Sequence, residues 1–434
     1  MEWGISGLII LIGLLFLLAL GMPIAFSMGF LSTVGIVTLL GPKQLYMLGQ
    51  TAYTTPNSYV LTAIPMFILM AEVLTGGAMT DDLFNAANKW LGRFRGGLAL
   101  SSVVACAIFA ALTGSSAADT AAMGKVCVPE MMKRGYDKRL ATGSVCAGGA
   151  LGILIPPSIL MIIYGSLTDQ SIARLFIGGV FPGILLTALF MAYILLVCKF
   201  KPHFAPDPER GIPWKDKLRS ALKIWWVLAL LLLIMGTIYA GICTPTEAAA
   251  CGCVGAVALT IIQKKGMNWK ELRTGILRTV RVTCMVLIIM VGAMIFGYFL
   301  THLGIPQGLV KWVTQLQVSR WVVMIAINLL LIGLGCILDV PSIIMITIPI
   351  LYPVITALGF DPIWFGIVVT MNMEMANITP PMGLNLFVMR AIVPEVKIGD
   401  IIMGVFPFIC IQALGLALVL GFPQLALWLP NTMR

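Results

Sequence analysis

Charged side chains are scarce in this chain of 434 residues. Asp, Glu, Lys and Arg together make up 11% of it, against about 25% in soluble domains. Histidine occurs only at His203 and His302, and no Gly-x4-Gly-Lys-[Ser/Thr] phosphate-binding motif is present. The low charge excludes a soluble enzyme, and the missing phosphate-binding loop argues against direct use of ATP.

Cysteine is present but shows no pattern of chemical use. The cysteines lie mostly inside apolar stretches, as at Cys106, Cys284 and Cys410, and none has the spacing of a metal site. Cys251 and Cys253 cannot place both sulfurs on one face of a helix. We therefore interpret the cysteines as packing residues.

Apolar residues make up most of the chain. They make up 59% of the chain, against about 45–50% in soluble domains, which places the chain in a bilayer. Segment 5–20 resembles a secretory signal, but only Glu2 supplies charge before it, and a second apolar run follows Pro23 directly. We interpret it as a mature helix.

The formal net charge of +10 could indicate nucleic acid, but in a membrane protein it is first a topology signal. We expect lipid and no nucleic acid as partner.

Ten apolar runs approach the length of a membrane span, about 17–25 residues. They lie at 4–20, 22–41, 61–76, 140–166, 175–198, 222–241, 244–263, 281–301, 363–389 and 402–428. If the remaining apolar stretches, 97–127 and 321–356, each enter and leave on one face, 23 of the 28 Lys and Arg residues fall on one side. The five on the other side are Lys43, Arg174, Lys311, Arg320 and Arg434. The basic side is then cytoplasmic and both termini lie outside.

The stretches 97–127 and 321–356 are predicted to be re-entrant hairpins. Reading either as a single crossing would spoil the charge asymmetry, although two closely spaced spans in each would conserve it. An amphipathic segment precedes each hairpin, at 81–95 and at 307–317. We interpret these two segments as arm helices at the membrane interface.

One sequence pattern occurs twice. Pro-x5-Gly-aromatic-Asp followed by Pro-Pro is found in 129–157 and in 353–381, offset by 224 residues at every matched position. In the predicted topology Pro23 starts a helix running outward and Pro245 one running inward, so the two copies are inverted. Inverted repeats are typical of secondary transporters. The predicted parts are a first repeat at 1–200, a cytoplasmic linker at 201–220 and a second repeat at 221–434.

The double prolines interrupt predicted spans, within Gly152–Ser158 and within Asn377–Gly383. Each proline lacks an N–H and clashes with the carbonyl a turn earlier, so the helix opens and leaves carbonyls unpaired. Inside a bilayer such backbone is tolerated only where protein or a polar cavity satisfies it. A packed proline kink is the alternative, but two breaks at equivalent positions favour ion sites.

The predicted hairpin tips, 114–120 and 335–342, combine small residues, hydroxyls and a carboxylate. Together with freed carbonyls they could supply hard oxygen ligands to a small cation, for which sodium is the natural candidate. Close packing of small residues is the alternative explanation. Carboxylates inside apolar stretches strengthen the cation interpretation, because they are costly in a membrane. They are Glu72, Asp119, Glu247, Asp339 and Glu374.

Four segments together resemble the large membrane subunit of TRAP transporters, the DctM type. These segments are Pro129–Asp137, Gly152–Ser158, Thr244-Pro245-Thr246-Glu247-Ala248 and Thr379-Pro380-Pro381-x-Gly383. The similarity runs across essentially the whole chain. It implies an all-α membrane protein, an inverted-repeat elevator transporter with about ten spanning helices, two re-entrant hairpins and two broken helices. It also implies no enzyme activity, no cofactor and Na+ as coupling ion.

The resemblance further implies particular residues. One sodium site would use Gly114, Ser115 and Ser116 with the break from Gly152 to Pro156. The other would use Gly335, Asp339, Thr379 and Met382. Substrate would lie between them, near Ser116, Ser158, Asp339, Asn377 and Pro381. Glu247 would orient its scaffold helix against a neighbour.

Family members take organic acids from an extracytoplasmic binding protein and couple uptake to sodium. The resemblance therefore implies import of a C4-dicarboxylate, sialic acid or a similar acid across a bacterial or archaeal inner membrane. The large-subunit pattern begins close to Met1, which leaves no room for four fused helices. We therefore expect a separate small four-helix membrane subunit docked on the scaffold.

Three other functions are alternatives to a secondary transporter. An intramembrane serine hydrolase using Ser115 or Ser116 would need a nearby base, but His203 lies in a predicted cytoplasmic loop and His302 at the far end of another helix. The permease of an ATP-driven importer should show a docking loop for its nucleotidase and need show no inverted repeat. A channel would carry substrate without a binding protein.

Overall fold

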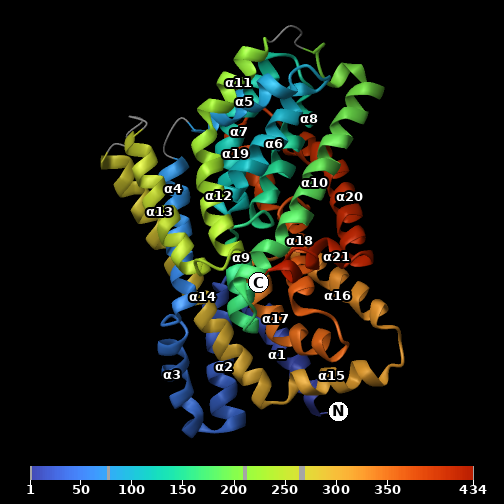
Figure 1. Cartoon of the computed structure of the whole chain (residues 1–434). Helices are drawn as coiled ribbons and strands as arrows, with labels where there is room; N and C mark the ends of the chain where they lie inside the picture. Colours follow the sequence, from blue (N-terminus) through green and yellow to red (C-terminus); the bar gives the residue numbers. More distant parts are fainter. Residues whose placement is uncertain (1, 76–78, 209–212, 263–268, 434) are drawn as a thin grey trace.

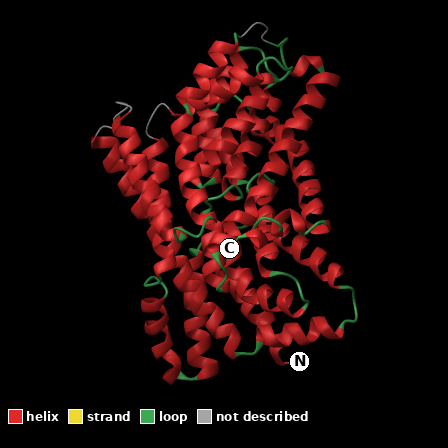
Figure 2. Cartoon of the chain, viewed as in Figure 1, coloured by secondary structure: helices red, strands yellow, loops and turns green. Residues whose placement is uncertain are grey.

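The computed structural model describes residues 2–75, 79–208, 213–262 and 269–433, and every regular element within these ranges is helical. Figure 2 shows the described chain as helices joined by short loops. This confirms the all-α prediction. The basic residues Arg210, Lys264, Lys265 and Arg434, which entered the charge count, lie outside the described residues.

The main helices of the first half follow one another from the amino terminus to the linker. They are α1 (Glu2–Ala19), α2 (Ile24–Gly35), α3 (Tyr46–Thr54), α4 (Ala63–Thr75), α5 (Met79–Leu91), α6 (Gly97–Thr113), α7 (Ser116–Lys133), α8 (Lys138–Ala150), α9 (Ile159–Thr168) and α10 (Ile172–Phe200). Helix α8 continues into a short 3-10 turn, Leu151–Ile153, before the first double proline.

The second half repeats the same succession after a linker helix. Its helices are α11 (Trp214–Lys223), α12 (Trp225–Tyr239), α13 (Pro245–Ile262), α14 (Trp269–His302), α15 (Ile305–Gln315), α16 (Arg320–Gly335), α17 (Val340–Ala357), α18 (Pro362–Ala376), α19 (Leu384–Ile392), α20 (Ile398–Gly421) and α21 (Gln424–Leu427). The arms are thus α5 and α15, the hairpins α6–α7 and α16–α17, and the broken helices α8–α9 and α18–α19.

Several predicted spans are composites of shorter helices. Among the described residues, four helices are long and apolar enough to cross a membrane alone, namely α10, α14, α17 and α20. Two bent pairs, Pro42–Thr54 with Tyr59–Leu74 and Trp214–Lys223 with Trp225–Tyr239, bring the number to six if each pair forms one span. The predicted runs 140–166 and 363–389 are each two helices separated by a break, which explains why fewer long helices are found.

The repeated Gly and Asp form a helix stop and a helix start in both halves. Gly135 and Gly359 have φ of 80° and 72°, the left-handed conformation that ends helices and that glycine adopts without steric cost. Two residues later, the carboxylates of Asp137 and Asp361 accept hydrogen bonds from backbone N–H groups in the first turn of α8 and of α18. Such N-caps stabilise a helix by about 1 kcal/mol. The repeat therefore fixes where each hairpin ends and each broken helix begins.

The aromatic residue of the repeat closes the base of its own hairpin. The Tyr136 hydroxyl accepts a hydrogen bond of 3.1 Å from the backbone N–H of Leu98, at the start of α6. Phe360 packs on Trp321, at the start of α16, with ring centroids 5.3 Å apart. Both aromatic rings thus tie the end of the second hairpin helix to the beginning of the first.

The two hairpins occupy opposite ends of the molecule. Figure 1 places α6 and α7 in the same half as arm helix α5, whereas α16 and α17 lie in the half that contains arm helix α15. The loops at the breaks lie between these halves (Figure 2). Helix α11, rich in Lys and Arg, lies beside α5 at one end (Figure 1). This arrangement supports two units of opposite orientation, while the repeat boundaries and the sidedness stay predictions.

The helices form two packing groups. In one, α4 packs on α13 and α14, and α2 on α14; in the other, α8 packs on α6, α7 and α20, and α18 on α16 and α20. The contacts α4 with α6 and α14 with α17 join the groups. Two helices were not predicted from the sequence, α3 and the linker helix α11, which lies against α5 with Trp214 5.5 Å from Trp90.

Candidate functional site

The first hairpin tip lies directly on the first helix break. A Cβ atom added at Gly152 would lie 3.0 Å from the backbone carbon of Ser115 and 3.1 Å from the backbone nitrogen of Ser116. One added at Gly114 would lie 2.6 Å from the backbone oxygen of Pro157. Only glycine allows two backbones to approach this closely. The structure therefore brings together the tip and break residues of the first candidate sodium site.

The first break is closed and buried. The Ser158 hydroxyl donates a hydrogen bond of 2.5 Å to the backbone oxygen of Ile153 and so spans the break. Pro156 and Ser158 are buried. Around this point α6 and α8 end while α7 and α9 begin. Helix C-termini favour cations and helix N-termini favour anions. The helix ends around the first break can therefore bind both a cation and an anion.

The second hairpin touches the end of α18 at Gly335. A Cβ atom added at Gly335 would lie 2.4 Å from the Cβ of Ala376, the last residue of α18. The Thr379 hydroxyl donates a hydrogen bond of 2.7 Å to the backbone oxygen of Met375. Its oxygen keeps lone-pair capacity for another ligand. Gly335 and Thr379 thus lie at one end of α18.

The remaining residues of the second site are exposed. Asp339 and Pro381 are exposed, and 55% of the surface of Met382 is accessible. Asp339 is the N-cap residue of α17, but its carboxylate makes no capping hydrogen bond. The structure therefore does not join Asp339 to Thr379 by a hydrogen bond among the described residues, and the second half is more open than the first.

Asn385 connects the two halves, which the sequence interpretation missed. Its side-chain nitrogen donates a hydrogen bond of 2.8 Å to the Ser116 hydroxyl in the first hairpin tip and one of 3.2 Å to the backbone oxygen of Cys146. Its backbone N–H donates one of 3.0 Å to the backbone oxygen of Asn377 at the second break. Ser116 and Asn377, both proposed substrate residues, thus share a partner. The sequence signal for this residue was an Asn within an apolar run, two residues after the Pro-Pro-x-Gly segment.

Two of the intramembrane carboxylates have local structural roles. Glu72 in α4 pairs with Arg278 in α14 at 3.6 Å. Glu247 accepts hydrogen bonds of 2.8 and 2.9 Å from the backbone N–H and the hydroxyl of Thr244, and the Thr244 hydroxyl accepts from the Glu247 backbone N–H. This reciprocal pattern is a capping box. The Glu247 carboxylate thus satisfies the start of its own helix, and the expectation that it orients this helix against a neighbour stays a prediction.

Asp119 and Glu374 differ from the other carboxylates. Both are completely buried, and neither carboxylate oxygen of either residue has a hydrogen-bond partner among the described residues. Asp119 lies in the first turn of α7, near the tip. No group of three or more His, Cys, Asp or Glu side chains within the described ranges could hold a metal ion. The candidate cation ligands are therefore hydroxyls and backbone carbonyls, with a single carboxylate, that of Asp339, in the second site.

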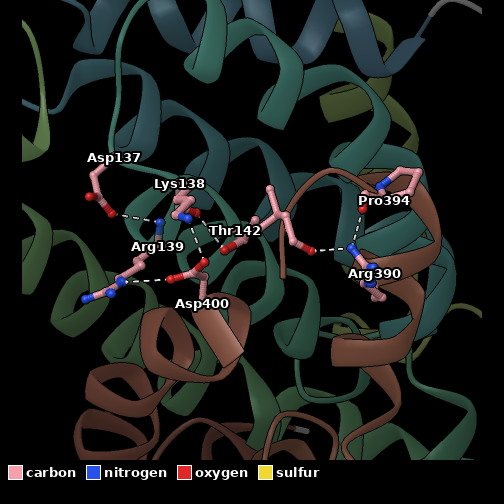
Figure 3. A network of polar contacts seen from close by, with 8 residues as sticks. Asp137, Lys138, Arg139, Thr142, Arg390, Pro394 and Asp400 are labelled. Atoms are coloured by element: carbon pink, nitrogen blue, oxygen red, sulfur yellow. Dashed lines mark hydrogen bonds and ion pairs between the residues drawn. The ribbon is translucent and has the colours of Figure 1, made fainter. Parts of the chain in front are cut away.

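A charged network fixes α8 against α20 (Figure 3). The Asp400 carboxylate lies 2.6 Å from the Lys138 ammonium and 3.3 Å from the Arg139 guanidinium. Arg390, at the end of α19, donates hydrogen bonds to the backbone oxygens of Pro394 and Val396 in the turn that leads to α20. These contacts anchor both broken helices at the same end of the molecule.

The comparisons with known proteins agree with this architecture. The model of the family described as tripartite ATP-independent periplasmic transporter, DctM component, matches residues 11–425. The C4-dicarboxylate TRAP transporter large permease protein DctM of Pseudomonas aeruginosa is 39% identical over 91% of this chain and 92% of its own length.

Other relatives act on different compounds. The isethionate TRAP transporter permease protein DctMQ of Oleidesulfovibrio alaskensis is 32% identical over 95% of this chain and 64% of its own length. The sialic acid TRAP transporter large permease protein SiaM of Vibrio cholerae is 29% identical over 96% of this chain and 97% of its own. The YdaH transporter of Alcanivorax borkumensis shares the fold, with a TM-score of 0.59 at 16% identity over 91% of this chain and 90% of its own.

All of these relatives are membrane permeases, not enzymes, which removes the hydrolase alternative. The apolar helices found here fit a multi-pass membrane protein. The chain belongs to the DctM family, the large permease component of TRAP transporters.

Proposed function

We propose that this chain is the permease subunit of a tripartite, sodium-coupled secondary transporter that imports an organic acid by an elevator movement. The observation that carries the proposal is the packing of the first hairpin tip on the first break at Gly152. Asn385 from the second half completes this contact by binding Ser116. Backbone carbonyls, hydroxyls and helix ends from both repeats therefore converge on one buried place.

Sodium binding is supported by the chemistry of the two tip and break pairs. Each pair contains hydroxyl or carbonyl oxygens beside the C-terminal end of a helix, where the helix dipole attracts a cation. The first site uses Gly114, Ser115 and Ser116 with the break from Gly152 to Pro156. The second uses Gly335, Asp339, Thr379 and Met382. Order in the exposed second tip would then depend on the ion.

An acid substrate is supported by the helix N-termini at the same place. Helices α7 and α9 begin at Ser116 and Ile159, after N-cap residues Ser115 and Ser158 that form no side-chain cap. Their free N–H groups suit a carboxylate or sulfonate without any Arg. The compounds named for the relatives, a C4-dicarboxylate, isethionate and sialic acid, are all acids. Substrate would lie near Ser116, Ser158, Asp339, Asn377 and Pro381.

The proposed assembly follows from family membership. An extracytoplasmic binding protein delivers the acid, and a separate small membrane subunit docks on the scaffold group that contains α2, α4, α13 and α14. The length of the relative DctMQ, of which this chain covers 64%, leaves room there for a further part. The complex would lie in a bacterial or archaeal inner membrane with both termini outside. The helices around the hairpins would move against the scaffold.

Uptake by proteoliposomes tests the proposal. We expect uptake driven by an inward sodium gradient, and none with potassium, when the chain is reconstituted with its small subunit and supplied with the binding protein. Asp339→Ala should abolish this uptake and leave the protein folded, because Asp339 is exposed. Asp216→Ala, at an exposed acid on the linker helix α11, is the control. Normal sodium-dependent uptake by Asp339→Ala contradicts the site, and equal uptake without the binding protein contradicts the tripartite mechanism.

A further inference from the structure

Glu374 and Gln412 form a buried polar pair that the proposed function does not use. Glu374 lies in α18 and is 0% exposed, and Gln412 lies in the adjacent α20 and is 2% exposed. The amide is close enough to influence the carboxyl group. Yet both carboxylate oxygens and both polar amide atoms lack hydrogen-bond partners. Four buried polar atoms on two adjacent helices therefore have their hydrogen bonds unmade.

Within the described part of the chain, no charged group pairs with Glu374. Among the described residues, no salt bridge to Glu374 is found, and its carboxylate oxygens have no hydrogen-bond partner. The titratable and charged groups on the described elements that pack against α18, together with its own cap, are Tyr164, Arg174, Tyr193, Cys198, Lys199, Arg320, Asp339, Tyr352, Asp361, Asp400 and Cys410. The charged ends of α18 and α20 are about 18 Å away along each helix, at 1.5 Å per residue. Glu374 thus faces no counter-charge.

The protonation state of Glu374 decides whether all four polar atoms of the pair can form hydrogen bonds. An ionised carboxylate can accept from the amide nitrogen, but the amide oxygen then faces an oxygen that has no proton to give. A neutral carboxylic acid donates its O–H to the amide oxygen while its carbonyl accepts from the amide nitrogen. This closed ring of two hydrogen bonds gives each of the four atoms a partner. The orientation of the amide can be chosen to suit the ring, since its O and N are assigned from the network.

We propose that Glu374 and Gln412 form a proton-binding site in which Glu374 is held as a neutral carboxylic acid. A sodium ion is a poorer ligand for this place, because the two side chains supply only three oxygens. An uncompensated charge in such a place is strongly destabilising. Loss of the proton at alkaline pH would put that charge into α18 less than one turn before the second break at Asn377. The site would therefore make the stability of this region depend on pH.

The inference does not depend on the substrate or the coupling ion, and its test needs no transport assay. Glu374→Gln replaces the acid by an amide that can form the same two hydrogen bonds with Gln412. The double exchange Glu374→Gln with Gln412→Glu restores one acid and one amide on opposite helices. Asp119→Asn is the matched control, because it removes a different buried and unpartnered carboxyl group.

Two measurements on the purified chain in detergent decide the matter. In infrared spectra at neutral pH, we expect a protonated-carboxyl carbonyl band that shifts in deuterated water, disappears in Glu374→Gln and persists in Asp119→Asn and in the double exchange. In thermal unfolding, the wild type and the double exchange should lose stability more steeply than Glu374→Gln as the pH rises above about 4.3, where the unfolded chain releases this proton and the folded chain retains it. An unchanged band in Glu374→Gln, equal pH dependence of the variants, or failure of Glu374→Gln to fold overturns the proposal.

Discussion

The contact between the first hairpin tip and Gly152 can be tested by adding a single methyl group. In Gly152→Ala the new Cβ would lie 3.0 Å from the backbone carbon of Ser115, 3.1 Å from its oxygen and 3.1 Å from the backbone nitrogen of Ser116. Ordinary contacts of this kind lie at 3.4–4 Å. All three neighbours are backbone atoms, so no flexible side chain can move aside. The tip must recede from the break by a few tenths of an ångström.

The expected magnitude follows from two opposing effects. Overpacking of a tight interior costs about 1–3 kcal/mol. Replacing glycine by alanine also restricts the unfolded chain, which stabilises by about 0.4–1 kcal/mol. The second effect changes only the free energy of unfolding. Sodium affinity depends on the overpacking, taken as about 1–2 kcal/mol for one methyl group, because this cost falls on the state in which the tip and the break are closed. Since 1.4 kcal/mol corresponds to a factor of ten in an equilibrium constant, we expect sodium affinity to fall roughly 5- to 30-fold.

The assay is the sodium concentration that gives half-maximal uptake in proteoliposomes. Gly152→Ala should raise this concentration while the amount of folded protein stays close to that of the wild type. Gly236→Ala in α12 is the control, because a Cβ there meets no atom within 4 Å. An unchanged sodium dependence in Gly152→Ala would refute the claim that the tip and the break share an ion.

Two further predictions concern residues that position the site. Asn385→Ala removes the partner of Ser116 and leaves buried polar groups unpaired, so we expect about 1–3 kcal/mol of lost stability and lost uptake; normal uptake together with an unchanged melting temperature would show that this link has no role. Asp361→Ala removes the N-cap of α18 and should cost about 1 kcal/mol without changing which ion drives uptake; an unchanged thermal unfolding curve would contradict the capping role.

The features predicted correctly from the sequence have local causes. The helix breaks were located because proline acts on the backbone within a few residues, whereas the helices of the hairpins and the arms were located from charge and amphipathic patterns. The two helices that were missed, α3 and α11, lie in segments that were interpreted as loops between predicted spans. The capping box of Glu247 was also available, since Thr-x-x-Glu is a local pattern.

What could not be predicted depends on neighbours distant in the chain. The hydrogen bond from Asn385 to Ser116 joins residues 269 positions apart. Apart from Asp339 at its hairpin tip, the intramembrane carboxylates looked equivalent in the sequence, but their environments differ. Arg278 pairs with Glu72, whereas Asp119 and Glu374 are buried with no hydrogen-bond partner among the described residues. These outcomes are set by which helices pack together, and hydropathy does not encode that.

Direct binding of radioactive sodium to the purified complex tests the central claim, that the hairpin tips and helix breaks hold the coupling ions. We predict saturable sodium binding that potassium does not displace and that is weakened by Gly152→Ala and by Asp339→Ala but not by Gly236→Ala. Absence of saturable binding, or binding that is the same in all three variants as in the wild type, would contradict the account.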